Sequence, residues 1–95
     1  MDLEFSGELI YWRGPAPYHF VSAPEEASAA IEAVSSMVTY GWGAIPVTAR
    51  VGSTDFRTSL FPQGEFYLVP IKAAVRQAEG IELGDQVTVQ LHLKT

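Results

Sequence analysis

Residues 66–93, FYLVPIKAAVRQAEGIELGDQVTVQLHL, contain the signals that decide the fold. They predict a strand, a short helix, a tight turn and a second strand. The helix begins at Pro70, because a proline has no N–H to leave without a partner in the first helical turn. It ends at Gly80, since glycine readily takes the left-handed conformation at a helix C-terminus, and Ile81 can fold back onto the last turn. The predicted apolar face of this helix consists of Ile71, Ala74, Val75 and Ala78.

The last strand follows a turn at Gly84-Asp85. In residues 86–93 apolar and polar side chains alternate, which is typical of a strand with one face in the core and one in water. The rest of the chain must therefore supply the sheet that this strand completes. The apolar positions are Val87, Val89, Leu91 and Leu93, and the polar positions are Gln86, Thr88, Gln90 and His92.

Residues 2–21 predict a loose antiparallel hairpin. Residues 2–12 alternate as a strand with one apolar face, and a glycine at its centre allows a bend. The segment RGPAP at 13–17 predicts a turn, because glycine frees one torsion and two prolines cannot donate to a ladder. Residues 18–21 then resume a short strand. The apolar face of the first strand consists of Leu3, Phe5, Gly7, Leu9 and Tyr11.

A helix is predicted after this hairpin. Ser22 or Ala23 caps its start, Pro24 lies in its first turn, and two glutamates follow at the positive end of the helix dipole. The segment YGWG at 40–43 ends the helix with two glycines. One apolar face, stepping by three and four residues, consists of Ala27, Ile31, Val34 and Val38.

Residues 45–51 and 56–60 predict the clearest hairpin, because both alternate and Gly52-Ser53 turns the chain between them. The segment FPQG at 61–64 predicts another turn. The order is therefore β-β-α-β-β-β-α-β in a single domain, residues 1–95. This mainly β chain with two helices predicts a small barrel that its helices plug or cap.

The composition excludes several classes of protein. The chain has no cysteine, so disulfides and thiolate metal sites are excluded. No signal-peptide pattern opens the chain, and no apolar stretch approaches the roughly 20 residues that cross a bilayer, so we expect a cytoplasmic protein without membrane contacts. Six scattered basic residues against eleven acidic ones give a net charge of −5, which disfavours binding to nucleic acid.

Three segments together carry a family resemblance: FSGELIYWRGPAPYHFV, GWGAIPVTARVGSTDFRTSLFP and YLVPIKAAVRQAEGIELGDQVTVQL. They resemble the family catalogued as domain of unknown function 1905, over nearly the whole chain. The resemblance implies a small, partly open, double-split β-barrel, an architecture shared with the swapped-hairpin DNA-binding domains of transition-state regulators. The family has no agreed activity, so the resemblance carries over no catalytic residue.

No catalytic or metal-binding signature is present in the sequence. His19 and His92 are the only histidines, and a metal site would need carboxylates at positions that the sequence does not define. A pair of Ser59 and His19 has no nucleophile motif around it, and glycine-rich phosphate-binding motifs are absent. We therefore expect no enzymatic activity, no metal and no cofactor. His92 is expected in solvent, and His19 is expected to be buried in an aromatic segment.

Aromatic side chains flank two turns that contain glycine. Such side chains either line a pocket or form a small core at the end of a barrel. Arg50 and Arg57 lie on the polar face of the hairpin. Facing into the barrel mouth, they could bind one anion together; facing outward, they are surface charges with Asp55 as a partner. The candidate ligand-binding residues are Trp12, Tyr18, His19, Trp42, Arg50 and Arg57.

Three functions follow from these features. The first is a non-catalytic binding module with an aromatic and arginine-lined mouth, whose ligand is small and anionic or aromatic. The second is a structural or protein-interaction domain, a homodimer included, which would use the open strand edge of a partly split barrel. DNA binding ranks last, because it rests on fold analogy and conflicts with the net charge of −5.

Overall fold

The computed structural model describes residues 1–13, 18–38 and 44–94, apart from the side chains of residues 36–38. The order of strands and helices confirms the predicted one. None of the described helices is long and apolar enough to cross a membrane. The strands are β1 Asp2–Trp12, β2 Tyr18–Ser22, β3 Ile45–Val51, β4 Thr54–Gln63, β5 Phe66–Pro70 and β6 Gln86–His92, and the helices are α1 Glu25–Val38 and α2 Ala73–Glu79.

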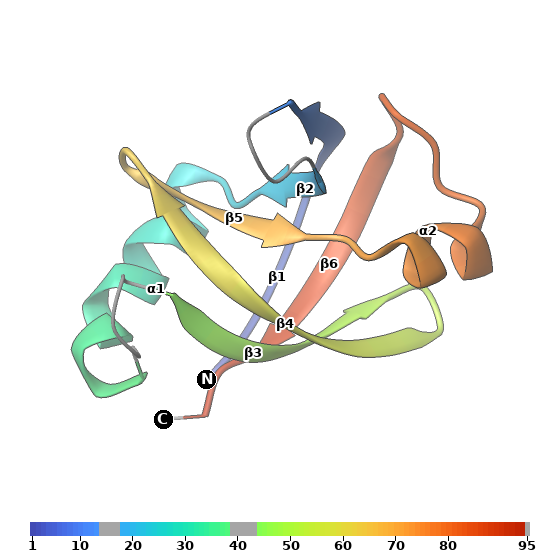
Figure 1. The fold of residues 1–95 in the computed structure, drawn as a ribbon. Coiled ribbons are helices and arrows are strands. Elements are labelled where there is room, and N and C mark those ends of the chain that lie inside the picture. Colours follow the sequence, from blue (N-terminus) through green and yellow to red (C-terminus); the bar gives the residue numbers. More distant parts are fainter. Residues whose placement is uncertain (14–17, 39–43, 95) are drawn as a thin grey trace.

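The six strands form a closed antiparallel barrel in the order β1-β2-β5-β4-β3-β6 (Figure 1). Residues 2–8 of β1 pair with β6 and residues 9–12 pair with β2. In the same way, residues 54–60 of β4 pair with β3 and residues 61–63 pair with β5. Each long strand therefore passes from sheet A, which contains β6 and β3, into sheet B, which contains β2 and β5. The double split is confirmed, but the barrel is closed rather than partly open, because β6 pairs with both β1 and β3.

The barrel consists of two equivalent halves, β1-β2-α1-β3 and β4-β5-α2-β6. In each half the long strand pairs with the strand that follows it and with the last strand of the other half. Leu9 and Leu60, where the two long strands change partner, are both buried, and Val21 lies opposite Val69 between the halves. The sequence contains no visible repeat, so this symmetry exists in the strand pairing alone.

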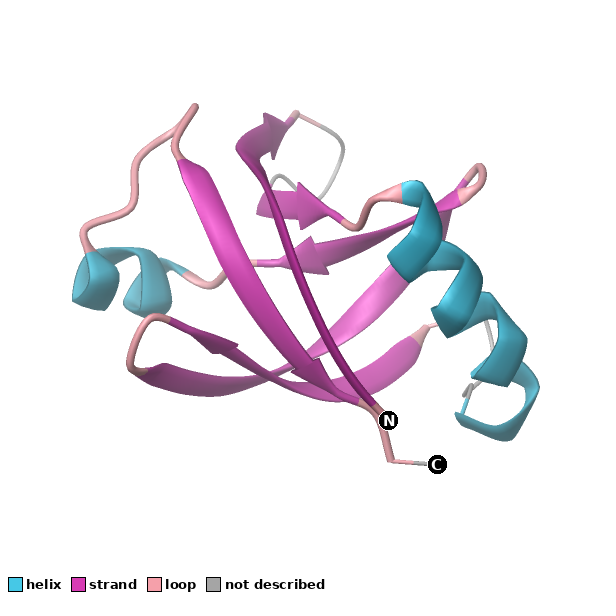
Figure 2. Ribbon diagram, turned by 180° about the vertical axis from the view of Figure 1, so that it is seen from behind, coloured by secondary structure: helices cyan, strands magenta, loops and turns pink. Residues whose placement is uncertain are grey.

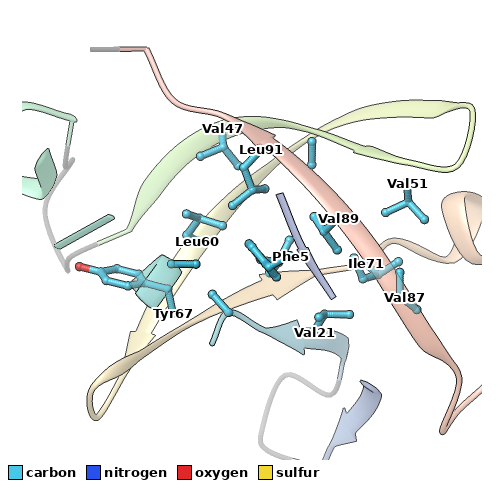
Figure 3. Packing of buried hydrophobic residues seen from close by; sticks show 14 of the residues in the cluster. Phe5, Val21, Val47, Val51, Leu60, Tyr67, Ile71, Val87, Val89 and Leu91 are labelled. Atoms are coloured by element: carbon cyan, nitrogen blue, oxygen red, sulfur yellow. The ribbon is translucent and has the colours of Figure 1, made fainter. Parts of the chain in front are cut away.

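The inner faces of both sheets form one apolar core (Figure 3). Helix α1 adds Ala27 and Ile31 at one end of the barrel, and α2 adds Val75 at the opposite end (Figure 2). The alternation predicted for β6 is confirmed, since its apolar positions are buried and its polar positions are exposed. Core residues that the figure labels include Phe5, Val21, Val47, Leu60, Val89 and Leu91.

Helix α1 begins later than predicted. Its first turn closes with the N–H of Ser28 donating to the carbonyl of Pro24 at 2.8 Å, and the helix runs from Glu25. Pro24 therefore occupies the N-cap position, rather than Ser22 or Ala23. The predicted apolar face is confirmed for Ala27, Ile31 and Val34, whereas the side chain of Val38 and the predicted helix end at 40–43 lie outside the described residues.

Helix α2 is shorter than predicted. It begins at Ala73, whereas Pro70 is the last residue of β5. Val75 is buried, but Ala74 and Ala78 are exposed, so the predicted apolar face is wrong at these two positions. A helix of seven residues set against the end of the barrel touches it along a narrow stripe, and the alanines lie outside that stripe.

The turn predicted at 61–64 is displaced, because β4 continues through Pro62. The strand tolerates this proline because its partner Tyr67 directs both backbone groups elsewhere. The N–H of Tyr67 donates to Ser28 Oγ at 3.1 Å, and its carbonyl accepts from the N–H of Ala23 at 2.8 Å. The Pro62–Tyr67 pair therefore exchanges no ladder bond, and the missing proline N–H leaves nothing unsatisfied.

Gly80 ends α2 in the left-handed conformation, with φ 64° and ψ 38°, which confirms the predicted cap. The N–H of Ile81 donates to the carbonyl of Arg76 at 2.9 Å, and Ile81 packs against the core. We expect Gly80→Val to lower the free energy of unfolding by more than about 1 kcal/mol, because a β-branched residue resists this conformation.

Urea unfolding followed by circular dichroism measures this change, with Gly80→Asn as a milder control. Among the described residues, nothing beyond the chain neighbours lies within 4 Å of the added Cβ, so the loss would report backbone strain and not a clash. Equal unfolding free energies for Gly80→Val and the parent would contradict the cap.

Candidate functional site

The outer face of sheet B is aromatic, and it holds two of the predicted ligand-binding residues. The rings of Trp12 and Tyr18 meet edge to face with 5.6 Å between centroids, and Phe61 lies 6.5 Å from Tyr18. Trp12 is 46% exposed and Phe61 is 40% exposed. The structure therefore brings Trp12 and Tyr18 together on the outside of the barrel. They do not line a barrel mouth as predicted, because helices cover the two ends of the barrel. We call the apolar part of this surface the aromatic face; it consists of Ile10, Trp12, Tyr18, Phe20, Phe61, Phe66, Leu68 and Pro70, and the polar residues Ser22 and Gln63 lie on the same side of the sheet.

Two residues of the aromatic face are buried without joining the main core. Phe20 is 6% exposed and Leu68 is 5% exposed, yet neither belongs to the core cluster inside the barrel. Tyr18 contacts Phe20 with 5.7 Å between ring centroids. The aromatic face therefore combines the two predicted alternatives, because it forms a small second cluster whose outermost rings stay in solvent.

His19 points to the face of β2 opposite Tyr18, because successive side chains of a strand alternate. Its ring meets Tyr11 edge to face at 4.8 Å, and its carbonyl accepts from the N–H of Ile71 at 2.9 Å. Burial, and secondly the charge of Arg76, lower the pKa of His19. Half-buried beside the start of α2, His19 is placed apart from the arginines with which it was grouped.

Arg50 lies on the outer face of sheet A. Its Nη1 contacts Asp55 Oδ1 at 3.2 Å, and its Nε donates to the carbonyl of Gly52 at 3.2 Å. The side chains of Arg50 and Asp55 are 47% and 62% exposed, so this pair is solvated. Arg50 is therefore a surface charge paired with Asp55. This confirms the predicted alternative in which its side chain faces outward and not into the barrel mouth.

Arg57 also faces outward, but it lines an open groove of about 830 Å³. The groove crosses β4 where the strand passes from sheet A to sheet B. On the sheet A side it contains Arg57 and Ser59, and on the sheet B side it reaches Phe61 and Pro70 of the aromatic face. Arg57 and the predicted aromatic residues are thus connected through Phe61, although Arg50 lies outside this groove.

Three basic side chains line the groove: Arg57, Lys72 and Lys94. Within the described residues, none of the three forms a salt bridge or a side-chain hydrogen bond. They are half of the six lysines and arginines in a chain of net charge −5. Unpaired cations gathered in one groove of an acidic protein are the strongest sign of a ligand site on this molecule.

His92 lines the same groove and is held by a carboxylate. Its Nδ1 lies 2.6 Å from Asp2 Oδ1, and both side chains are exposed. The hydrogen bond with His92 is the main cause that lowers the pKa of Asp2. Asp2 therefore orients the imidazole ring and, when the ring is protonated, compensates its charge.

Lys72, Lys94, Phe61 and Pro70 were missed by sequence reasoning, because their convergence depends on strand pairing. Trp42 lies outside the described residues, so its predicted role stays a prediction. Among the residues that the structure describes, no group of three or more His, Asp or Glu side chains could hold a metal ion.

A comparison with known protein families identifies the family of this chain. The family model described as Domain of unknown function (DUF1905) matches residues 5–91. Because the match covers nearly the whole chain, the chain belongs to this family. No curated protein sequence matches the chain.

Proposed function

We propose that this domain binds an organic anion with an apolar portion in the groove across β4. The observation that carries the proposal is the set of three unpaired cations, Arg57, Lys72 and Lys94, beside Phe61 and Pro70. A volume of about 830 Å³ is within the range of small-molecule sites. The guanidinium of Arg57 can bind a carboxylate or phosphate through two parallel hydrogen bonds, while Phe61 offers a ring for apolar contact.

The proposed function is binding without catalysis. One histidine, His92, lines the groove; it is paired with Asp2, and both members of the pair are exposed. Thr48, Thr58 and Ser59 line the same groove, but among the described residues no hydroxyl group is hydrogen-bonded to His92, so the hydrogen bonds give no support to an activated nucleophile. Three cations also cannot neutralise many phosphates, and duplex DNA is therefore not the proposed partner.

Titration calorimetry with phenyl phosphate, benzoate and the neutral analogue benzyl alcohol tests the proposal. We expect the two anions to bind and the alcohol not to bind, because the cations supply most of the free energy. Arg57→Gln should weaken phenyl phosphate binding about tenfold or more, since a hydrogen bond to a charged group contributes about 1.5–3 kcal/mol.

Arg50→Gln is the matched control, because it removes the same charge from a site outside the groove. It should leave the affinity nearly unchanged at physiological salt, where screening limits distant charges. Failure of both anions to bind, or equal losses in the two variants, would refute anion binding in this groove.

A second candidate function is self-association through the aromatic face. None of the eight residues of this face is charged, and Trp12, Phe61 and Phe66 are exposed at 40–46%. Two copies of a chain with net charge −5 repel each other, and sheet A presents Asp2, Glu4 and Glu8. The aromatic face allows two identical chains to meet without opposing these charges, and a two-fold contact would place the same rings against each other.

Sedimentation velocity tests the dimer directly, because one chain has a mass of 10.4 kDa. We expect a dimer that Trp12→Ser converts to a monomer, since exposed aromatic side chains contribute most to such interfaces. Leu83→Ser, which removes an exposed apolar side chain outside the aromatic face, should leave the dimer intact. A parent protein that stays monomeric at high concentration would exclude this function.

A further inference from the structure

The groove across β4 also exposes a strand edge. Residues 54–60 of β4 have β3 as their ladder partner on one side, and pairing with β5 begins only at residue 61. Among the described residues, no backbone hydrogen bond reaches the other side of this seven-residue stretch. Backbone N–H and C=O groups on that side are therefore free to bind an added strand.

Two of the strand prolines, Pro62 and Pro46, show which backbone groups face this edge. The Pro62–Tyr67 pair exchanges no ladder bond, so the adjacent residue 61 is the one that bonds to β5. Every second residue of an antiparallel strand points the same way, so Arg57 and Ser59 direct their backbone groups toward the groove. Pro46 of β3, which has no N–H to donate, lies opposite Ser59. This is expected if the backbone groups of Ser59 point away from β3 and toward the groove.

The side chains around this edge define the charge of its partner. Arg57 lies on the edge strand, and Lys72 lies across the groove from it, directly after β5. The equivalent edge in the other half of the barrel is residues 2–8 of β1, which carry three acidic side chains, Asp2, Glu4 and Glu8, whereas the acidic residue of the β4 stretch, Asp55, is paired with Arg50. An acidic strand would therefore be attracted by the edge of β4 and repelled by the edge of β1.

We infer that the edge of β4 binds an extended acidic peptide segment by strand addition. The free edge over residues 55–59 has room for about five residues of extended chain, roughly 16 Å. Backbone hydrogen bonds from Arg57 and Ser59 hold the segment, and its alternate carboxylates meet Arg57, Lys72 and Lys94 in the groove. The inference rests on the proposed anion site, and adds to it the class of ligand and the backbone contacts.

The test uses an acetylated and amidated pentapeptide in which glutamate alternates with valine. Nuclear magnetic resonance titration of the labelled protein should shift the amide signals of Arg57 and Ser59 and slow their hydrogen exchange. A second peptide with the same charges carries N-methyl groups on the alternate residues that would donate to β4. We expect it to bind at least about tenfold more weakly, because two hydrogen bonds and the close approach are lost.

A variant of the protein probes the same contacts from the other side. Ser59→Pro removes an N–H that faces the groove and leaves the β3 ladder intact. Because Ser59 also lines the groove, phenyl phosphate binding is measured beside it, and the glutamate peptide should be weakened more than phenyl phosphate. Equal binding of the two peptides would overturn strand addition while the anion site stands. If neither the peptide nor phenyl phosphate bound the folded parent protein, the anion site and this inference would both be overturned.

Discussion

Leu91→Ala is expected to lower the free energy of unfolding by about 2–5 kcal/mol, the usual cost of emptying a leucine-sized space in a packed core. Leu91 is 2% exposed and lies near the end of β6, between Leu3 of β1 and Ala49 of β3. Because β6 closes the barrel, a cavity at this position removes contacts from both neighbouring strands. Urea unfolding followed by circular dichroism measures the loss.

Gln90→Ala is the matched control on the adjacent residue. Its side chain lies on the outer face and donates one exposed hydrogen bond to Glu4 Oε1 at 2.8 Å, which water can replace. The expected loss is below about 1 kcal/mol. If Gln90→Ala proved the more damaging variant, the register of β6 would be shifted by one residue, and every face on this strand would invert.

Ser28→Ala should lower the free energy of unfolding by about 1–3 kcal/mol, although it removes a single oxygen atom. Ser28 is 1% exposed, and its Oγ joins three elements. It donates to the carbonyl of Ala23 at 3.0 Å and accepts from the N–H of Tyr67 at 3.1 Å. The alanine variant leaves that backbone donor of β5 buried without a partner, and each such group costs about 1–3 kcal/mol.

Ser6→Ala provides the comparison for a serine in solvent. The Oγ of Ser6 lies 2.8 Å from Thr88 Oγ1 on the exposed face of sheet A, where water can satisfy the hydroxyl group of Thr88 after the substitution. Its loss should stay within about 0.5 kcal/mol. Thermal unfolding of both variants separates the two cases, and equal melting temperatures would show that Ser28 does not join α1 to the sheet.

The strands and helices were predictable because their signals lie within a few neighbouring residues. Alternation in residues 86–93 placed β6 and its buried face, and Gly80 marked the end of α2. Pro62 was misassigned to a turn because its tolerance in β4 depends on Tyr67, whose backbone groups bind residues 23 and 28. Such a contact between distant segments leaves no trace in local sequence.

The candidate site was predictable only in part. Trp12 and Tyr18 belong to one hairpin, so their contact follows from local pairing. Arg50 and Arg57 were grouped as two arms of another hairpin, but they lie two residue pairs apart along its ladder, and this separates an ion pair from a cation without a salt bridge. Arg50 lies beside Asp55 near the turn, whereas Arg57 lies where β4 turns toward sheet B.

By itself, the sequence determined the order of elements, the buried faces of β1, β3, β4 and β6, and the chemical types available for binding. Only the tertiary structure decided which of these residues meet. Arg57, Lys72 and Lys94 come from β4 and from the segments after β5 and β6, and the closure of the barrel brings them to one groove. The physical reason is that the side of a strand on which a residue lies depends on the two-residue period of that strand. Which residues from distant segments come together depends on how the strands pair.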